Sequence, residues 1–248
     1  MAAVMAEVGA GQRGILRARN AARDRLQATI PANYNPWLHL GATTGIGVAA
    51  LVVGLVMIHA PTWRELLTIP LVFVFANAFE WRAHKDLLHH RRPPLHELYD
   101  RHTPEHHMVF GYDDMAIREP RELHRVLIPW IGVLGIVVAV APLAWALGHF
   151  WSPNRGWLFL VCSAIYMVGY ELSHTSYHLA PDSFVGRLAL VRFLREHHRR
   201  HHHPRLMQRW NFNVTIPLFD WLHRSIVSEK VLAETLAEDA APPADQFS

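Results

Sequence analysis

The sequence predicts an all-α integral membrane protein, with four transmembrane helices and a histidine-rich helical cap on one side of the membrane. Hydrophobic residues make up 51% of the 248 residues, yet the mean hydropathy is only +0.06, so these residues must be concentrated in blocks. Most of the 19 histidines lie in four short clusters that follow the second and the fourth of these blocks. The length suits one membrane bundle with polar extensions.

Four apolar blocks are expected to form the transmembrane helices. Leu38–Ile58 is 21 residues long without Asp, Glu, Lys or Arg, which is enough to cross roughly 30 Å of hydrocarbon. Val126–Trp151 is equally free of charge. Leu66–Phe79 and Gly156–Tyr170 are short for complete spans, so their helices are expected to continue into the polar sequence that follows. Buried helices of a soluble bundle are the alternative, but four such blocks in one chain favour a membrane.

Positive charges predict how the chain is oriented. All of the 24 lysines and arginines except Arg64 and Arg155 fall in residues 1–37, 80–125 or 171–248. With four spans these three segments lie on the same side, which the positive-inside rule places in the cytoplasm. Topology therefore explains the basic isoelectric point near 9.3, and nucleic-acid binding is not needed to account for it.

One membrane domain is predicted between two cytoplasmic tails. The domain covers residues 34–227, and the tails are residues 1–33 and 228–248. Residues 1–30 have no apolar core long enough for a secretory signal. They are expected to form either a helix on the membrane surface or a disordered tail. The Ala/Arg-rich tails suggest a bacterial inner membrane, with the endoplasmic reticulum as the alternative in a eukaryote.

The histidine clusters predict a di-metal site in the cytoplasmic cap. The single cysteine, Cys162, excludes a cysteine-based zinc site, so imidazole and carboxylate must hold any metal. His84 and His89 are five residues apart, about 140° around an ideal helix, and are expected to approach a cavity from different directions. Helical residues at i and i+3 or i+4 share a face. This spacing relates His102 to His106, His174 to His178, and His198 to His201 and His202.

Two glutamates are candidates for groups that orient the imidazoles. The second block ends in FEWRAH and the fourth in YELSH, so an aromatic residue and a glutamate precede the first histidine in each. A carboxylate at the membrane boundary is costly and usually has a partner. Glu80 is therefore expected either to orient an imidazole near His84 or to reach the membrane interface, and the same holds for Glu171 near His174.

At this point the pattern resembles the fatty acid hydroxylase/sterol desaturase superfamily of membrane non-haem di-metal enzymes. The similar boxes are HKDLLH, HTPEHH, HTSYH and HRRHH, and NFNVTIPLFDWLHRS is similar to the closing segment of that family. This segment places Asp220 in a characteristic position, which makes it a further candidate for supporting the ligands. The resemblance covers about residues 34–227. It implies that two metal ions are held by His84, His89, His102, His106, His107, His174, His178, His198, His201 and His202.

Two features of the boxes depart from the family pattern or leave it open. Three residues separate His102 from His106, where many members have two. The crowded run HHRRHHH leaves open whether His197 or His198 is the ligand. The metals are taken as iron in such enzymes, although imidazole also binds zinc well.

The function expected from the membrane setting and the resemblance is O2-dependent hydroxylation of a C–H bond on a lipid, such as a fatty acyl chain, a sphingolipid or a sterol-like molecule. Desaturation and carotenoid hydroxylation by the same metal core are alternatives, and a non-enzymatic metal-binding membrane protein is a remote one. The sequence has neither a dinucleotide-binding fingerprint nor cysteines for an iron–sulfur cluster. Two electrons must therefore come from a separate ferredoxin- or cytochrome-type donor and its reductase.

Overall fold

The computed structural model describes residue 17 and residues 20–240, and these residues are predominantly helical with no β-strand among them. The predictions for residues 1–16, 18–19 and 241–248 fall outside the described residues. The long helices are α2 (Pro36–Met57), α4 (Thr68–Ala83), α8 (Trp130–Phe150), α9 (Pro153–Tyr177), α10 (Ala189–His201) and α12 (Glu229–Ala240). The short ones are α3 (Trp63–Leu66), α5 (His96–Arg101), α6 (His107–Val109), α7 (Leu123–Val126), α11 (Leu218–Leu222), the π-helices η1 (His84–Leu88) and η2 (His102–His106), and the 3-10 helix η3 (Pro120–Glu122).

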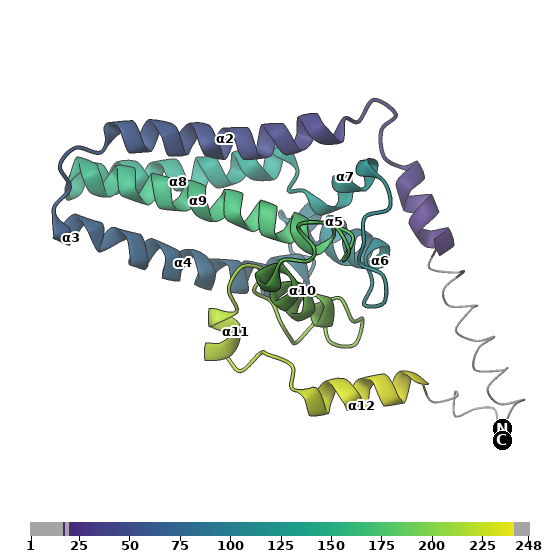
Figure 1. The fold of residues 1–248 in the computed structure, drawn as a ribbon. Coiled ribbons are helices and arrows are strands. Elements are labelled where there is room, and N and C mark those ends of the chain that lie inside the picture. Colours follow the sequence, from purple (N-terminus) through teal and green to yellow (C-terminus); the bar gives the residue numbers. More distant parts are fainter. Residues whose placement is uncertain (1–16, 18–19, 241–248) are drawn as a thin grey trace, which may run out of the picture.

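Four helices are long and apolar enough to cross a membrane, as the sequence predicts. They run alongside one another in the bundle of Figure 1. The fold class is therefore confirmed as far as an all-helical chain with four membrane-compatible helices and a histidine-rich end. The four segments are Pro36–Met57, Trp63–Leu88, Gly132–Phe150 and Pro153–Tyr177.

Helix α9 is the centre of the bundle. It packs against α2, α4 and α8. Within the protein, 39% of the most apolar stretch of α9 is buried, compared with 6% of the corresponding stretch of α8. Glycines allow the close approach of the backbones. A Cβ atom on Gly156 of α9 would lie 2.5 Å from the carbonyl oxygen of Ala144, and one on Gly54 of α2 would lie 2.5 Å from Val161. Small residues at such contacts are typical of helix packing in membranes, where van der Waals contact drives association.

Two spanning helices extend into the polar sequence that follows them, as predicted, whereas a third begins later than predicted. The helix of the second block continues through η1, and α9 continues to Tyr177, so both carry histidines out of the apolar sequence as expected. The third span begins at Trp130 rather than at Val126. Proline disfavours the helical conformation in the residue before it, so Pro129 separates α7 from α8 and itself caps α8 with extended dihedral angles.

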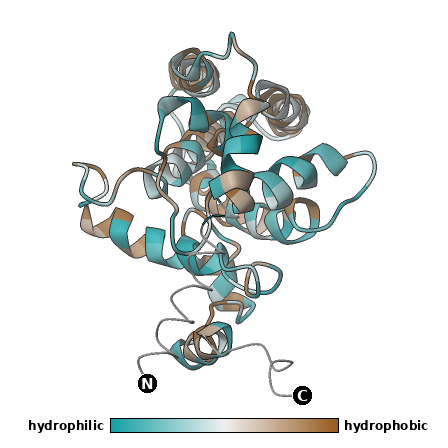
Figure 2. Cartoon of the chain, turned by 90° about the vertical axis from the view of Figure 1, so that its right-hand side faces the viewer, coloured by the Kyte–Doolittle hydropathy of each residue, from teal (hydrophilic) through white to brown (hydrophobic). Residues whose placement is uncertain are grey.

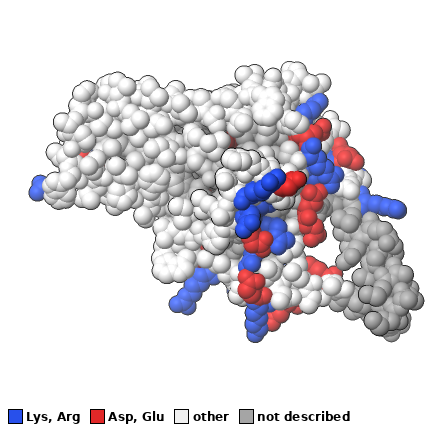
Figure 3. Space-filling view, in the orientation of Figure 1, with Lys and Arg blue, Asp and Glu red and all other residues white. Residues whose placement is uncertain are grey.

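The short helices form a polar cap at one end of the bundle. Viewed from that end, hydrophilic residues colour many of the nearest elements, and the spanning helices behind them are largely hydrophobic (Figure 2). On the face drawn in Figure 3, charged side chains gather at the cap and the surface of the bundle is almost free of them. This separation matches the distribution of charge along the sequence, and it places the histidine boxes at a single end.

Parts of both predicted tails pack onto the cap. Residues 20–28 are helical, and Arg23 within them is only 2% exposed. Its guanidinium donates to Glu122 at 2.7 Å and to the carbonyl of Ala116 at 2.9 Å. At the other terminus, Leu232 of α12 is buried against Leu206 and Val227. The folded unit thus extends beyond residues 34–227 on both sides.

Candidate metal centre

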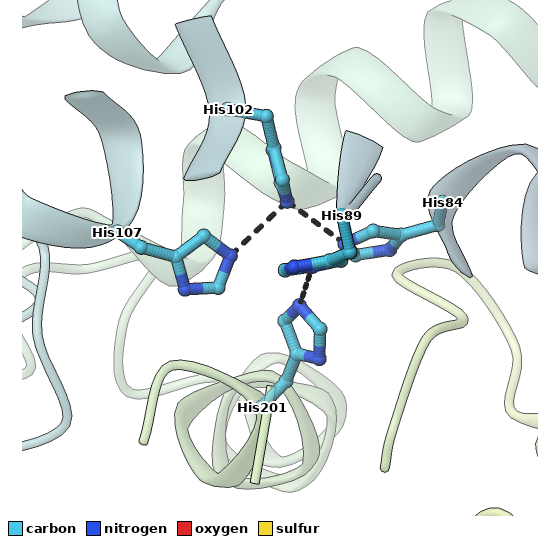
Figure 4. Close-up of side chains that lie close together, drawn as sticks. All are labelled: His84, His89, His102, His107 and His201. Atoms are coloured by element: carbon cyan, nitrogen blue, oxygen red, sulfur yellow. Dashed lines mark hydrogen bonds between the residues drawn. The ribbon is translucent and has the colours of Figure 1, made fainter. Parts of the chain in front are cut away.

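Ten histidines converge in two buried clusters at the cap. Within each cluster the five nitrogen atoms that could bind a metal all lie within 4.8 Å of one another. The members are the ten residues expected from the sequence. The first cluster contains His84, His89, His102, His107 and His201, and it is drawn in Figure 4. The second cluster contains His106, His174, His178, His198 and His202.

Two π-helical turns explain how the first cluster forms. The expectation that His84 and His89 approach from different directions is wrong, because their rings stack with centroids 5.1 Å apart at 20°. The intervening turn is the π-helix η1, and a π turn widens the repeat from i+4 to i+5, so residues five apart come to one face. The π-helix η2 does the same for His102 and His107, whose Nε2 atoms lie 3.1 Å apart.

Ordinary α-helical spacing supplies two pairs in the second cluster. His174 and His178 lie one turn apart at the end of α9, and His198 and His202 lie one turn apart at the end of α10. His201 of α10 turns instead to the first cluster. The two clusters are adjacent, since the rings of His107 and His202 stack with centroids 4.3 Å apart.

Backbone carbonyls determine the tautomer of five imidazoles. A carbonyl only accepts hydrogen bonds, so each contacted Nδ1 must carry the proton and the Nε2 of the neutral ring must carry a lone pair. In this state the ring can bind a metal through Nε2. The pairs are His106 with Arg125 at 2.9 Å, His178 with Met115 at 2.8 Å, His201 with Trp210 at 2.8 Å, and the shorter contacts of His84 with Phe212 and of His202 with Phe110.

A threonine hydroxyl determines the tautomer of His89. Thr103 Oγ1 donates its hydrogen to the Leu88 carbonyl at 2.7 Å and therefore accepts from His89 Nδ1 at 3.1 Å. The Nε2 atom of His89 is then a lone-pair atom. It lies 2.9 Å from the Nε2 of His201, whose Nδ1 donates to Trp210. Two lone pairs face each other at hydrogen-bond distance in a buried place.

A metal cation between the two rings would remove the repulsion between the lone pairs of His89 and His201. A proton is disfavoured at the same place. Burial, with a smaller contribution from the neighbouring imidazoles, lowers the pKa of His89 to about 2. Burial also lowers the pKa of His201 to about 4. Both rings are therefore neutral near pH 7, and a neutral ring is the metal-binding form of histidine.

The distances between the ring nitrogens fit metal ligation. Imidazole binds transition metals at about 2.0–2.1 Å, so two neighbouring ligands of an octahedral ion lie about 3 Å apart. The Nε2 atoms of His84 and His102 are 2.9 Å apart, and so are those of His198 and His202. In the second cluster three further Nε2 atoms are buried without any hydrogen-bond partner: those of His106, His174 and His178. A metal ion is a natural partner for these buried lone pairs.

The structure places His198, and not His197, in a cluster. His198 is fully buried. His197 belongs to neither cluster, and its Nε2 contacts Asp220 at 3.0 Å. His203 and His90 also lie outside both clusters; His203 contacts Asp239 at 2.8 Å, and His90 contacts the carbonyl of Lys85 at 2.9 Å.

The three candidate carboxylates act on the backbone around the clusters rather than on the imidazoles themselves. Glu80 accepts hydrogen bonds from the backbone amides of Val214 and Thr215 and from the hydroxyl of Tyr166. Glu171 accepts from the backbone amide of Ile128 at 3.2 Å. Neither glutamate bonds to a histidine of the clusters within the described chain, so any support they give to the rings passes through the backbone that they hold.

Asp220 organises the loop that bears two of the orienting carbonyls. Its carboxylate accepts from the backbone amide of Phe212 at 2.9 Å, from that of Asn213 at 2.7 Å and from the hydroxyl of Ser225 at 2.7 Å. Asp220 and Glu80 therefore fix residues 210–215, whose carbonyls hold His84 and His201. Sequence reasoning missed Thr103 and the carbonyl partners, because a carbonyl belongs to every residue and leaves no signal in the sequence.

Fold and site together define a helical protein with four membrane-compatible helices and two adjacent, buried, all-histidine clusters that could each hold a metal ion. Comparisons with protein-family models, with curated proteins and with solved structures found no match to this chain.

Proposed function

We propose that the protein is a membrane-bound, O2-dependent non-haem di-iron oxygenase that hydroxylates a C–H bond of a lipid. The observation that carries the proposal is the pair of adjacent five-histidine clusters with lone-pair nitrogens turned inward. Imidazole ligands without cysteine suit both iron and zinc. Iron is proposed because the order and content of the four boxes resemble the fatty acid hydroxylase/sterol desaturase superfamily.

The chain's own part in this reaction is to hold the metals, keep the rings neutral and limit the access of water. Phe110 and Phe212 are fully buried beside the rings of the two clusters. The buried carbonyls keep the protons on Nδ1 and away from the ions. Two bound iron ions would supply the chemistry of O2 reduction, in which two external electrons and two protons yield one inserted oxygen atom and one water.

A lipid is the substrate class that suits the position of the site. His84 and His174 belong to segments apolar enough to cross a membrane, so the clusters lie where these segments leave the apolar region. An acyl chain, a sphingolipid or a sterol-like molecule can reach this level from within the membrane, and its apolar part can remain among the helices. The site is proposed to face the cytoplasm of a bacterial inner membrane, because nearly all positive charges share its side.

The two electrons are proposed to come from a separate ferredoxin- or cytochrome-type protein with its reductase. Near the first cluster Arg82 is exposed and pairs with Asp86, and Lys85 lies over the ring of Trp81, so the two cations outnumber the one carboxylate. An acidic donor would be steered toward such a surface, and the attraction would weaken with salt. Long-range steering of this kind accelerates association more than it raises affinity.

The proposal is tested by the products formed in membranes. The protein is expressed with iron and a reductase system, and fatty acyl, sphingolipid, sterol and carotenoid pools are analysed by mass spectrometry. A gain of one oxygen is expected. A loss of two hydrogens would assign the same core to desaturation. Unchanged lipids in all pools, with two irons bound, would refute an oxygenase function.

The ligand assignment is tested by metal content. His174→Ala and His201→Ala are each expected to lower the bound metal, because each removes a ligand from a different cluster. His90→Ala is the matched control, since His90 lies beside a box but outside the clusters. Full occupancy in both cluster variants would show that these histidines are not ligands.

A further inference from the structure

The short helix α11 and its flanking turns form an apolar corner outside the four spanning segments. Ile216 and Trp221 are each 67% exposed, and Leu222 is 53% exposed. Asp220, Trp221, Leu222, Arg224 and Ile226 line a surface cavity of about 420 Å³. In Figure 3 the uncharged surface of the bundle continues onto the part of the molecule where α11 lies. Exposed apolar residues of this number mark a binding surface.

The corner is bonded to a buried residue within the apolar part of a spanning segment. Asn77 of α4 donates to the carbonyl of Ile216 at 2.8 Å and accepts from the amide of Phe219 at 3.3 Å. Asn77 lies seven residues before His84, a rise of about 10 Å toward the apolar part of the helix. Phe75 and Phe79 of α4 are also exposed, but on an ideal helix they lie about 160° around the axis from Asn77 and so belong to another face of α4. The corner is therefore attached to the apolar part of the second spanning segment.

Arg224 lies at the edge of this corner, with an unusual backbone conformation and an unpaired side chain. It follows α11 in the left-handed region, with φ of 53°, where glycine or asparagine is the usual residue and other residues are strained by about 1 kcal/mol. Arg224 is exposed, and its guanidinium has no hydrogen bond or ion pair with any described residue. The carboxylate of Asp220 is buried and faces other partners, His197, Phe212, Asn213 and Ser225, so it does not form an ion pair with Arg224. The cation is therefore available to an external anion.

We propose that the α11 corner is embedded in the same membrane as the spanning helices and that Arg224 binds the headgroup of an anionic phospholipid. Tryptophan is enriched at the membrane interface, apolar side chains enter the hydrocarbon below it, and arginine attracts anionic headgroups. The corner combines these three features. The phosphate would lie beside Arg224 and the acyl chains along Trp221, Leu222 and Ile226.

This anchoring would also support the first histidine cluster. The corner is continuous with residues 210–215, whose carbonyls hold His84 and His201. Asp220 ties the two parts together through its bonds to Phe212 and Asn213. A lipid bound at Arg224 would restrain the turn after α11, which is bonded to this loop through the amide of Asn211 and the carbonyl of Ser225 at 2.7 Å. The inference does not depend on the reaction proposed above, only on the four segments being in a membrane.

Fluorescence quenching by brominated phospholipids tests the proposal in reconstituted full-length protein. The difference between wild type and Trp221→Phe isolates the emission of Trp221. Bilayers contain a small fraction of dibrominated lipid, either anionic phosphatidylglycerol or zwitterionic phosphatidylcholine. Trp221 is expected to be quenched by both, and roughly fivefold enrichment of the anionic lipid is expected from a single arginine at the surface. High salt should reduce the preference.

Two substitutions separate the charge from the backbone, each made with and without Trp221→Phe. Arg224→Asn is compatible with the left-handed conformation, so it should fold normally, retain quenching by both lipids and lose the anionic preference. Arg224→Lys should keep the preference. Quenching of Trp221 by aqueous iodide and not by brominated lipid would overturn the embedding. Equal quenching by the two brominated lipids in the wild type would overturn the headgroup site.

Discussion

The hydroxyl of Thr103 offers a sharp test of how the first cluster is organised. Thr103→Val keeps the shape of the side chain but removes the oxygen that accepts from His89 Nδ1 at 3.1 Å. The buried Nδ1–H group of His89 then loses its hydrogen-bond partner. The tautomer with the proton on Nε2 becomes more populated as a result. A lost buried hydrogen bond costs about 1–3 kcal/mol, and comparable changes around metal sites lower affinity about 10–100-fold.

The expected result is selective loss of one ion. Because the Thr103 side chain contacts only the first cluster, Thr103→Val should weaken one site and leave the other unchanged. Competition with a graded chelator, followed by elemental analysis, should show a concentration at which the wild type retains both ions and the variant retains one. Thr103→Ser keeps the hydroxyl and should behave as wild type. Unchanged affinity in Thr103→Val, or equal loss of both ions, would refute the reasoning.

Three further substitutions test the supporting structure. Glu80→Gln should lower the thermal unfolding temperature and the metal content together, because an amide cannot accept from all the donors around this carboxylate, a loss of about 1–3 kcal/mol. Gly156→Ala should destabilise the detergent-solubilised protein by about 1–3 kcal/mol, whereas Gly135→Ala, with open space around it, should change its unfolding temperature little. Arg23→Met should cost about 3–5 kcal/mol by leaving a buried carboxylate unpaired, and Arg25→Met at an exposed position should cost almost nothing in the same unfolding assay.

The membrane helices and the set of clustered histidines were predictable because each has a local signal. A run such as Leu38–Ile58 without charge is sufficient to indicate a span. Histidines one helical turn apart, such as His174 and His178, share a face whatever the rest of the fold does. The structure brings all ten predicted histidines together, and they divide five to each cluster.

The division of the histidines between clusters was not predictable from α-helical spacing. His84 and His89 meet only because η1 is a π-helix, and no residue in HKDLL marks a π turn in advance. The roles of Glu80 and Asp220 were hidden for a different reason. Their partners are backbone amides more than 130 residues away for Glu80 and seven or eight away for Asp220. Such contacts depend on the tertiary fold, which a single sequence does not encode locally.

The connectivity of the two clusters implies that metal binding and packing of the cap depend on each other. The α4–η1 segment supplies only the first cluster, through His84 and His89, and α9 supplies only the second. The segment from His102 to His107 and the end of α10 each supply both. No cluster can therefore be completed by a single segment. Two ions would tie both spanning helices to both parts of the cap, so part of the binding free energy becomes stabilisation of the cap. Removal of the ions should loosen α10 and residues 102–107 together, and hydrogen exchange in these segments should rise while exchange within the bundle stays unchanged.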